Sequence, residues 1–249
     1  MYVCASTDCF PELPLAEALE RLADLEFTRV EISLREEGGS LPPSEVHSGL
    51  DAAVLACRET HRLKPVAYAV DIPPDARQYY ELFHACCRLA KATKVAAVTV
   101  PAAELGTPFN AEVERLRELV RIGTVEGVVV SVKTERDRMT QDPDTAVVLC
   151  DNVKGLAVAL DPSHYICGPH GGASYDQLMR YVGHVQLRDS KRDAFQVRVG
   201  QGEIEYGRLV AQLNKVRYGR ALSVHIEPMP DIEHAAELRK LRLLLESLL

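Results

Sequence analysis

LAVALDPSHYICGPHGGASYDQLMRYVGHVQLRDSKR, residues 156–192, contains two apolar runs that each end in polar side chains. The first run stops at Asp161, and His164 follows three residues later; the second run ends with Gln186 and Arg188. Between them, residues 174–182 are expected to form an amphipathic helix. Parallel α/β folds carry their chemistry at the carboxyl ends of the strands. We therefore expect a functional site where these two runs end.

The same alternation of strand-like and helix-like segments runs through the whole chain. Two strands are expected inside the quoted stretch, and the other six at residues 2–5, 29–33, 65–70, 95–100, 128–132 and 221–226. Helices are expected at residues 14–25, 45–61, 73–91, 111–126, 143–150, 174–182, 206–215 and 232–249. Eight strands alternating with eight helices in 249 residues predict an α/β fold, a single (β/α)8 TIM barrel that forms one domain over residues 1–249.

Composition narrows the class of protein. A net charge of −7 without a basic stripe argues against general binding to nucleic acid or anionic membrane. The seven cysteines show no CxxC spacing, the N-terminal segment has no signal-peptide pattern, and no apolar run is long enough to span a bilayer. We expect a cytoplasmic protein whose partner is a small molecule, with no contact to membrane or nucleic acid.

Side-chain alternation predicts which residues face the barrel lumen. In the fifth strand Val128, Val130 and Val132 suit the helix-facing side, which turns Ser131 and Lys133 inward. The same reasoning places these side chains inward: Glu31, Ser33, Asp71, Thr99, Glu135, Asp161, His184, Gln186, Arg188, Ser223, His225 and Glu227. Burying so many polar groups is costly unless they pair with each other, a metal or a ligand. Both a structural ion-pair network and a binding site fit this pattern.

Four motifs carry a resemblance to a known family. They are Asp161-Pro-Ser-His164, HVQLRDSKR at residues 184–192, VGQGEIEY at 199–206 and YGRALSVHIEP at 218–228. With them the chain resembles the xylose-isomerase-like TIM barrels, a sugar (phosphate) isomerase/epimerase superfamily that includes tagatose-3-epimerase-like and inosose-dehydratase-like enzymes. The resemblance implies a divalent cation at the barrel mouth, held by Glu, Asp, His and Glu from strands five to eight. It also implies proton exchange beside a carbonyl by the two glutamates, and homodimerisation.

This chain matches the family pattern at some positions and departs from it at others. Asp161 matches the metal-binding Asp, His164 the histidine after it, and Arg192 a substrate-contacting arginine. Lys133, Gln186 and His225 stand where the family has Glu, His and Glu, although Glu227 is an alternative match for the last. Because an ammonium group does not ligate a cation, the resemblance implies a degenerate metal site and no bound cofactor. A shifted site for Mn, Mg, Co or Zn, built from Glu135, Asp161, His225 and Glu227, stays open.

These observations predict a sugar isomerase/epimerase-like protein that acts on or binds a small sugar, keto-sugar or polyol, with or without a phosphate. The predicted catalytic residues are Lys133, Asp161, His225 and Glu227. The predicted substrate-binding residues are Glu31, Glu135, His164, Gln186, Arg188 and Arg192. Two alternatives stay open: an inactive family member that binds a ligand or partner, and a lyase that forms a Schiff base with Lys133.

Overall fold

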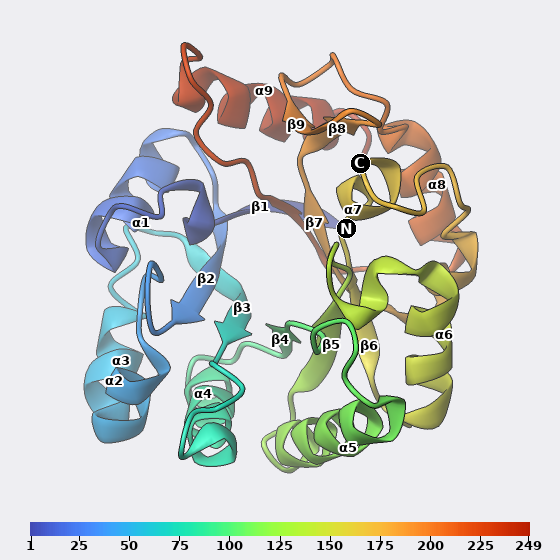
Figure 1. Ribbon diagram of the computed structural model, residues 1–249. Helices are drawn as coiled ribbons and strands as arrows, with labels where there is room; N and C mark the ends of the chain where they lie inside the picture. Colours follow the sequence, from blue (N-terminus) through green and yellow to red (C-terminus); the bar gives the residue numbers. More distant parts are fainter.

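The computed structural model describes all residues, 1–249, and its centre is a closed barrel of eight parallel strands (Figure 1). The strand order around the barrel is β1-β10-β7-β6-β5-β4-β3-β2. The bounds are β1 Tyr2–Ser6, β2 Arg29–Arg35, β3 Lys64–Asp71, β4 Ala97–Val100, β5 Val129–Lys133, β6 Ala157–Leu160, β7 Val182–Leu187 and β10 Ala221–Val224. The predicted TIM barrel is confirmed.

Helices surround the strands on the outside of the barrel (Figure 1). They are α1 Leu15–Asp24, α2 Pro43–Ser48, α3 Leu50–Ala56, α4 Tyr79–Ala92, α5 Phe109–Val125, α6 Pro143–Asn152, α7 Ser163–Ile166, α8 Tyr206–Lys215 and α9 His234–Glu246. Short 3-10 helices lie at η1 Thr7–Cys9, η2 Met139–Gln141 and η3 Asp176–Tyr181. The apolar strand faces pack against these helices; Val128, Val130 and Val132 are all buried in this core, as expected.

Three predicted helices differ from the structure. The helix expected at 45–61 is divided into α2 and α3, because Gly49 leaves the helical conformation with φ −144° and ψ 59°. The helix expected at 73–91 begins only at Tyr79, since two consecutive prolines supply no N–H donors and hold the chain before it in a turn. The helix expected at 174–182 is the six-residue 3-10 helix η3, which buries only Leu178 and Met179.

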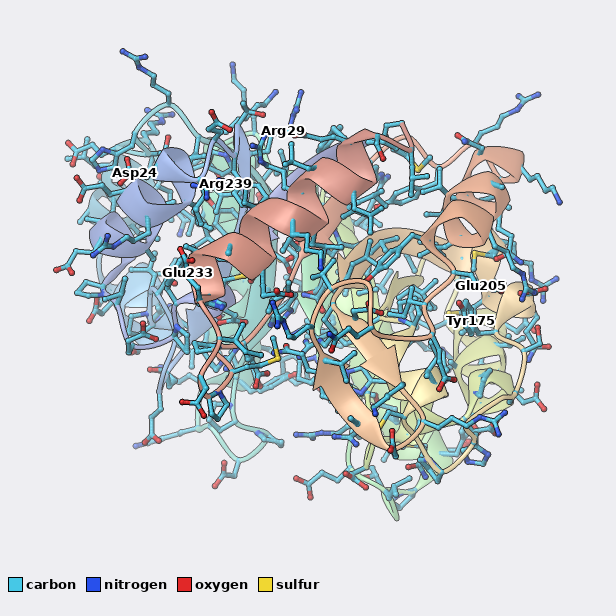
Figure 2. The ribbon with its side chains drawn as sticks, turned by 90° about the horizontal axis from the view of Figure 1, so that it is seen from above. Asp24, Arg29, Tyr175, Glu205, Glu233 and Arg239 are labelled. Atoms are coloured by element: carbon cyan, nitrogen blue, oxygen red, sulfur yellow. The ribbon has the colours of Figure 1, made fainter.

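A two-stranded hairpin that the sequence analysis did not predict follows β7. It consists of β8 Asp189–Lys191 and β9 Ala194–Val197, which pair antiparallel. The Asp189 carboxylate accepts hydrogen bonds from the N–H groups of Gly200 (2.7 Å) and Gly202 (3.0 Å), and a Cβ at Gly202 would lie 2.1 Å from that carboxylate. The glycine-containing segment after β9 is therefore a turn anchored on the hairpin. In Figure 2 the hairpin lies toward one edge of the molecule and Arg29, the first residue of β2, toward the opposite edge.

The lumen is lined by polar side chains, as the alternation predicted. Glu31, Ser33, Thr99, Ser131, His184 and Ser223 are all at most 1% exposed. The strands' carboxyl ends carry larger ionisable groups, and these define the candidate site. No helix of the structure is long and apolar enough to cross a membrane.

Candidate active site at the barrel mouth

The deepest part of the candidate site is the Glu31 carboxylate of β2, which is fully buried. It accepts a hydrogen bond from the Gln186 amide (2.7 Å) and contacts His184 Nε2 (3.0 Å), both on β7 across the lumen. Burial alone would raise the pKa of Glu31, but the charge and hydrogen bond of His184 outweigh it and lower this pKa to about 2. Glu31 is therefore a carboxylate at neutral pH.

Asp161 and Arg188 form a buried ion pair between the ends of β6 and β7. Arg188 Nε lies 3.3 Å from Asp161 Oδ2, and both side chains are at most 5% exposed. The other Asp161 oxygen, Oδ1, accepts the N–H of Ser163 at 2.9 Å. Arg188 also contacts Glu227 (3.3 Å), whose side chain is 63% exposed. The arginine thus bridges a buried carboxylate and an exposed one.

His164 lies beside this pair with its tautomer fixed by the backbone. Its Nδ1 accepts the Arg136 N–H at 2.9 Å, so a proton on the ring must sit on Nε2, which lies 3.8 Å from Asp161 Oδ2. Burial lowers the pKa of His164 to about 4, and Arg188 adds to the shift, although Asp161 opposes it. His164 is therefore neutral at neutral pH and offers an N–H donor to the mouth.

His225, just after β10, is a second histidine held neutral. Burial lowers its pKa well below the ordinary value, and the cations Arg188, Lys133 and Arg35 add to this although Glu31 opposes them. Its Nε2 lies 3.7 Å from Asp8 Oδ2, and its buried Nδ1 has no hydrogen-bond partner. An unprotonated imidazole in this position can accept a proton.

Lys133, the last residue of β5, supplies a cation that the protein does not neutralise. It is only 8% exposed, yet its ammonium forms no ion pair within 4.0 Å. Its charge contributes to lowering the pKa of both His164 and His225. The Lys133 charge therefore acts on both histidine rings.

The β8–β9 hairpin closes one side of the mouth with Phe195. The guanidinium groups of Arg136 and Arg188 lie over its ring at 4.2 and 4.7 Å, and the His164 ring lies 4.6 Å away. The next residue, Gln196, exchanges two hydrogen bonds with the backbone of Glu227 (2.7 and 2.9 Å). The hairpin therefore fixes Arg188 and the β10 end on the same side of the site.

Most of the predicted site residues meet in two groups. Glu31 contacts Gln186, while Arg188 joins Asp161 and Glu227 with His164 beside them. The other four predicted residues are not joined to either group by a contact. Lys133 forms no ion pair and His225 lies against Asp8. Glu135 is half-buried with an unpartnered Oε2, and the Arg192 guanidinium lies against the loop at Gly172.

Asp8, Arg35 and Phe195 also belong to the site, although they were not predicted from the sequence. Arg35 donates to Asp8 at 2.6 Å, and this pair adjoins His225. Arg35 shares the alternation of Glu31 and Ser33, so extending the count by one step along β2 would have found it. Asp8 follows β1 in the short helix η1, and no alternation pattern reaches it.

The residues at the mouth do not fit the divalent cation that the family resemblance implies. No group of three or more His, Cys, Asp and Glu side chains is placed to hold a metal ion, and this includes Glu135, Asp161, His225 and Glu227. At the positions of the family ligands, Lys133 presents an ammonium group and Gln186 donates its amide to Glu31. A cation beside Lys133 would be repelled.

Comparisons with known proteins agree with the observed architecture. A family model described as xylose isomerase-like TIM barrel matches residues 19–244. No curated protein sequence matches. Among solved structures, a xylose isomerase-like TIM barrel protein from Mycobacterium smegmatis in complex with magnesium is 15% identical, with a TM-score of 0.80 and coverage of 100% of this chain and 98% of the other.

Two further similar structures are epimerases. D-allulose 3-epimerase from Methylomonas sp. is 12% identical, with a TM-score of 0.77 and coverage of 100% and 98% of the two chains. 3-Keto-D-glucoside 4-epimerase from E. coli is 14% identical, with a TM-score of 0.74 and coverage of 99% of each chain. At these identities the likeness establishes the fold.

Proposed function

The chain belongs to the xylose isomerase-like TIM barrel family, and from this premise we propose that it is an isomerase or epimerase of a small keto-sugar. In this proposal the Lys133 ammonium takes the place of the family's divalent cation. The observation that carries the proposal is that the barrel mouth holds both a buried cation without an ion-pair partner, Lys133, and a buried neutral imidazole, His225, whose pKa this cation helps to lower. The substrate class is favoured by the similarity to two sugar epimerases.

The proposed reaction begins with His225 removing the proton from the carbon next to the substrate carbonyl. The electron pair of that C–H bond forms the carbon–carbon double bond of an enediolate, and the carbonyl oxygen takes the negative charge. The Lys133 ammonium stabilises this oxygen, since a preorganised charge in a water-poor site acts strongly on developing charge. Return of the proton by the His225 imidazolium to the former carbonyl carbon, while the hydroxyl proton on the neighbouring carbon passes to the oxyanion, gives the isomer. Delivery of a solvent proton to the opposite face of the enediolate, with His225 losing its own proton to solvent, gives the epimer.

The surrounding groups have supporting roles in this proposal. Asp8, 3.7 Å from His225 Nε2, stabilises the imidazolium formed when His225 takes the proton. The Nε2–H of His164 and the guanidinium of Arg188 are donors for substrate hydroxyl groups. Phe195 supplies an apolar surface beside them and limits access of water.

Solvent-proton exchange tests this function directly. The protein, treated with a chelator, is incubated in D2O with a panel of ketoses, and deuterium at the carbon beside the carbonyl is followed by proton NMR. We expect exchange for at least one ketose, and at least about 100-fold slower exchange in His225→Gln and Lys133→Met. Equal exchange in the wild type and both variants would refute the assignment.

Two other outcomes would each replace the proposal. Trapping of a substrate on Lys133 by borohydride would establish Schiff-base chemistry in its place. Binding of a ketose without any exchange would show a ligand-binding family member that lacks catalysis.

We also propose that the protein works in the cytoplasm. All seven cysteines are free thiols, and six of them are buried. Free cysteines are typical of reducing compartments.

A further inference from the structure

A cavity lies at the end of the lumen opposite the mouth, where the strands begin. Its volume is about 260 Å³, and its lining includes the first residues of four strands: Tyr2, Arg29, Lys64 and Ala221. Arg29 lies at the edge of the molecule away from the hairpin (Figure 2). This volume is somewhat below the roughly 300–1,000 Å³ of pockets for drug-sized ligands, so it suits a smaller molecule.

The charges around this cavity are all positive. Arg29, Lys64, Lys94 and Arg220 line it together with no carboxylate. None of the four forms an ion pair, in a chain whose net charge is −7. Arg29 instead stacks on the Tyr2 ring at 4.4 Å, and Arg220 donates to the Gly183 carbonyl at 3.3 Å, contacts that leave both charges intact. Converging cations without partners favour an anion.

One residue that lines the cavity has a buried polar atom without a partner. His184 lines it and is 1% exposed. Its Nε2 contacts Glu31 at 3.0 Å, whereas its Nδ1 has no hydrogen-bond partner. A buried ring nitrogen that lacks a partner is destabilising. Since Nε2–H faces the Glu31 carboxylate, Nδ1 carries a proton only in the imidazolium form of the ring. A negatively charged ligand in the cavity would favour that form and accept a hydrogen bond from Nδ1–H.

We propose that this cavity is a binding site for a phosphate group, which Arg29, Lys64, Lys94 and Arg220 surround and which accepts a hydrogen bond from His184 Nδ1. Phosphate fits because it carries between one and two negative charges near neutral pH and has several acceptor oxygens. The site is separate from the mouth and does not depend on the reaction proposed there. His184 is the residue that touches both the phosphate site and the Glu31 carboxylate.

Calorimetric titration with inorganic phosphate at constant ionic strength tests this site. The variant is Lys64→Gln/Lys94→Gln, because both lysines are exposed and hold no other element in place. The matched control is Lys154→Gln/Lys215→Gln, which removes the same charge from two exposed, unpaired lysines outside the cavity. We expect saturable binding, at least tenfold weaker in the variant and within twofold of wild type in the control. Phosphate binding that is weakened equally in the variant and the control, or the absence of saturable binding to the wild type, would overturn the proposal.

The nitrogen-15 NMR signals of the His184 ring give a second readout in the unmodified protein. Phosphate at saturation is expected to shift the Nδ1 resonance, because that atom gains its hydrogen-bond partner. An unmoved Nδ1 resonance while other cavity residues respond would show that the phosphate does not reach His184, and would contradict the site as proposed. A sugar phosphate used in the same titration distinguishes a binding site for free phosphate from one for a phosphorylated compound.

Discussion

The two ends of the barrel are both rich in ionisable side chains, but they balance charge in different ways. At the mouth, Arg188 is paired with Asp161 and Arg35 with Asp8, whereas Lys133 is a buried cation without an acidic partner. At the other end the cations around the cavity, such as Arg29 and Lys64, have no acidic partner. The mouth lies where burial makes an unpaired charge costly, whereas the other end is open enough for water to solvate its lysines. An unpaired charge in the mouth is therefore stronger evidence of a function than an unpaired charge at the other end of the barrel.

Breaking the buried ion pair should have the largest effect on stability. Asp161→Asn leaves the Arg188 guanidinium buried with only the exposed Glu227 as a partner, and it is expected to cost about 3–5 kcal/mol of unfolding free energy. Urea denaturation measures this loss. Glu227→Gln, which removes the exposed partner of the same arginine, is the control and should cost no more than about 1 kcal/mol. Equal losses would mean that Asp161 is more solvated than its burial indicates.

The pH dependence of stability should reflect the histidines at the mouth. The pKa of His164 is lowered to about 4 in the folded protein, while the unfolded chain binds the proton near pH 6.5. Since the unfolded state then binds more protons, stability should rise as the pH increases from 4 to 6.5, by up to about 3 kcal/mol from this residue.

Thermal or urea unfolding across this pH range, compared between wild type and His164→Asn, checks the contribution of His164. In the variant, the unfolding free energy should rise less steeply with pH. The rise that remains comes in part from His225, whose pKa is also lowered. If the unfolding free energy of the variant rose with pH as steeply as that of the wild type, the pKa of His164 would not be lowered, and its ring would be in contact with solvent.

Replacing Lys133 by methionine should separate stability from activity. The change keeps the length of the side chain but removes a buried charge without a partner, so stability should stay the same or rise by about 1 kcal/mol. Proton exchange on the ketose substrate should fall as proposed above. A loss of stability above about 2 kcal/mol would indicate that the ammonium has a structural partner within the mouth.

The smallest effect is expected at the other end of the barrel. Lys64→Gln and Lys94→Gln each remove an exposed charge from a group of like charges and should change the unfolding free energy by less than about 0.5 kcal/mol. Phosphate should raise the melting temperature of the wild type but not of the double variant, because only the wild type keeps the full set of cations. If phosphate raised the melting temperature of both proteins equally, the two lysines would not contribute to phosphate binding, and the cations at this end of the barrel would have no assigned ligand.

The sequence predicted the barrel because strand length and alternation are local properties. The apolar face of β5 and the polar residues at the ends of β6 and β7 were visible without any structure. The β8–β9 hairpin was not, since the residues of DSKRDAFQV are mostly polar and pair only after the chain has turned back over the mouth.

The candidate site was predicted residue by residue but not as a set of contacts. Alternation identified Glu31, Gln186 and Arg188 as inward-facing, yet it did not reveal that Glu31 reaches β7 across the lumen. That pairing depends on the closure and stagger of the barrel, which are properties of the whole sheet. Asp8 was missed for a similar reason, because it approaches His225 only when β1 and β10 pair.

The most direct test of the central claim is the metal content of the purified protein, combined with thermal unfolding in the presence of Mn²⁺, Mg²⁺, Co²⁺ or Zn²⁺. A ligand that binds only the folded state adds about 2.7 kcal/mol of stability at a hundredfold excess over its dissociation constant. With Lys133 as the resident cation, we predict no stoichiometric metal and no such stabilisation in the wild type, and gain of metal binding in Lys133→Glu. Stoichiometric metal, with a stabilisation that disappears in Asp161→Ala, would contradict the account and restore metal-assisted isomerisation.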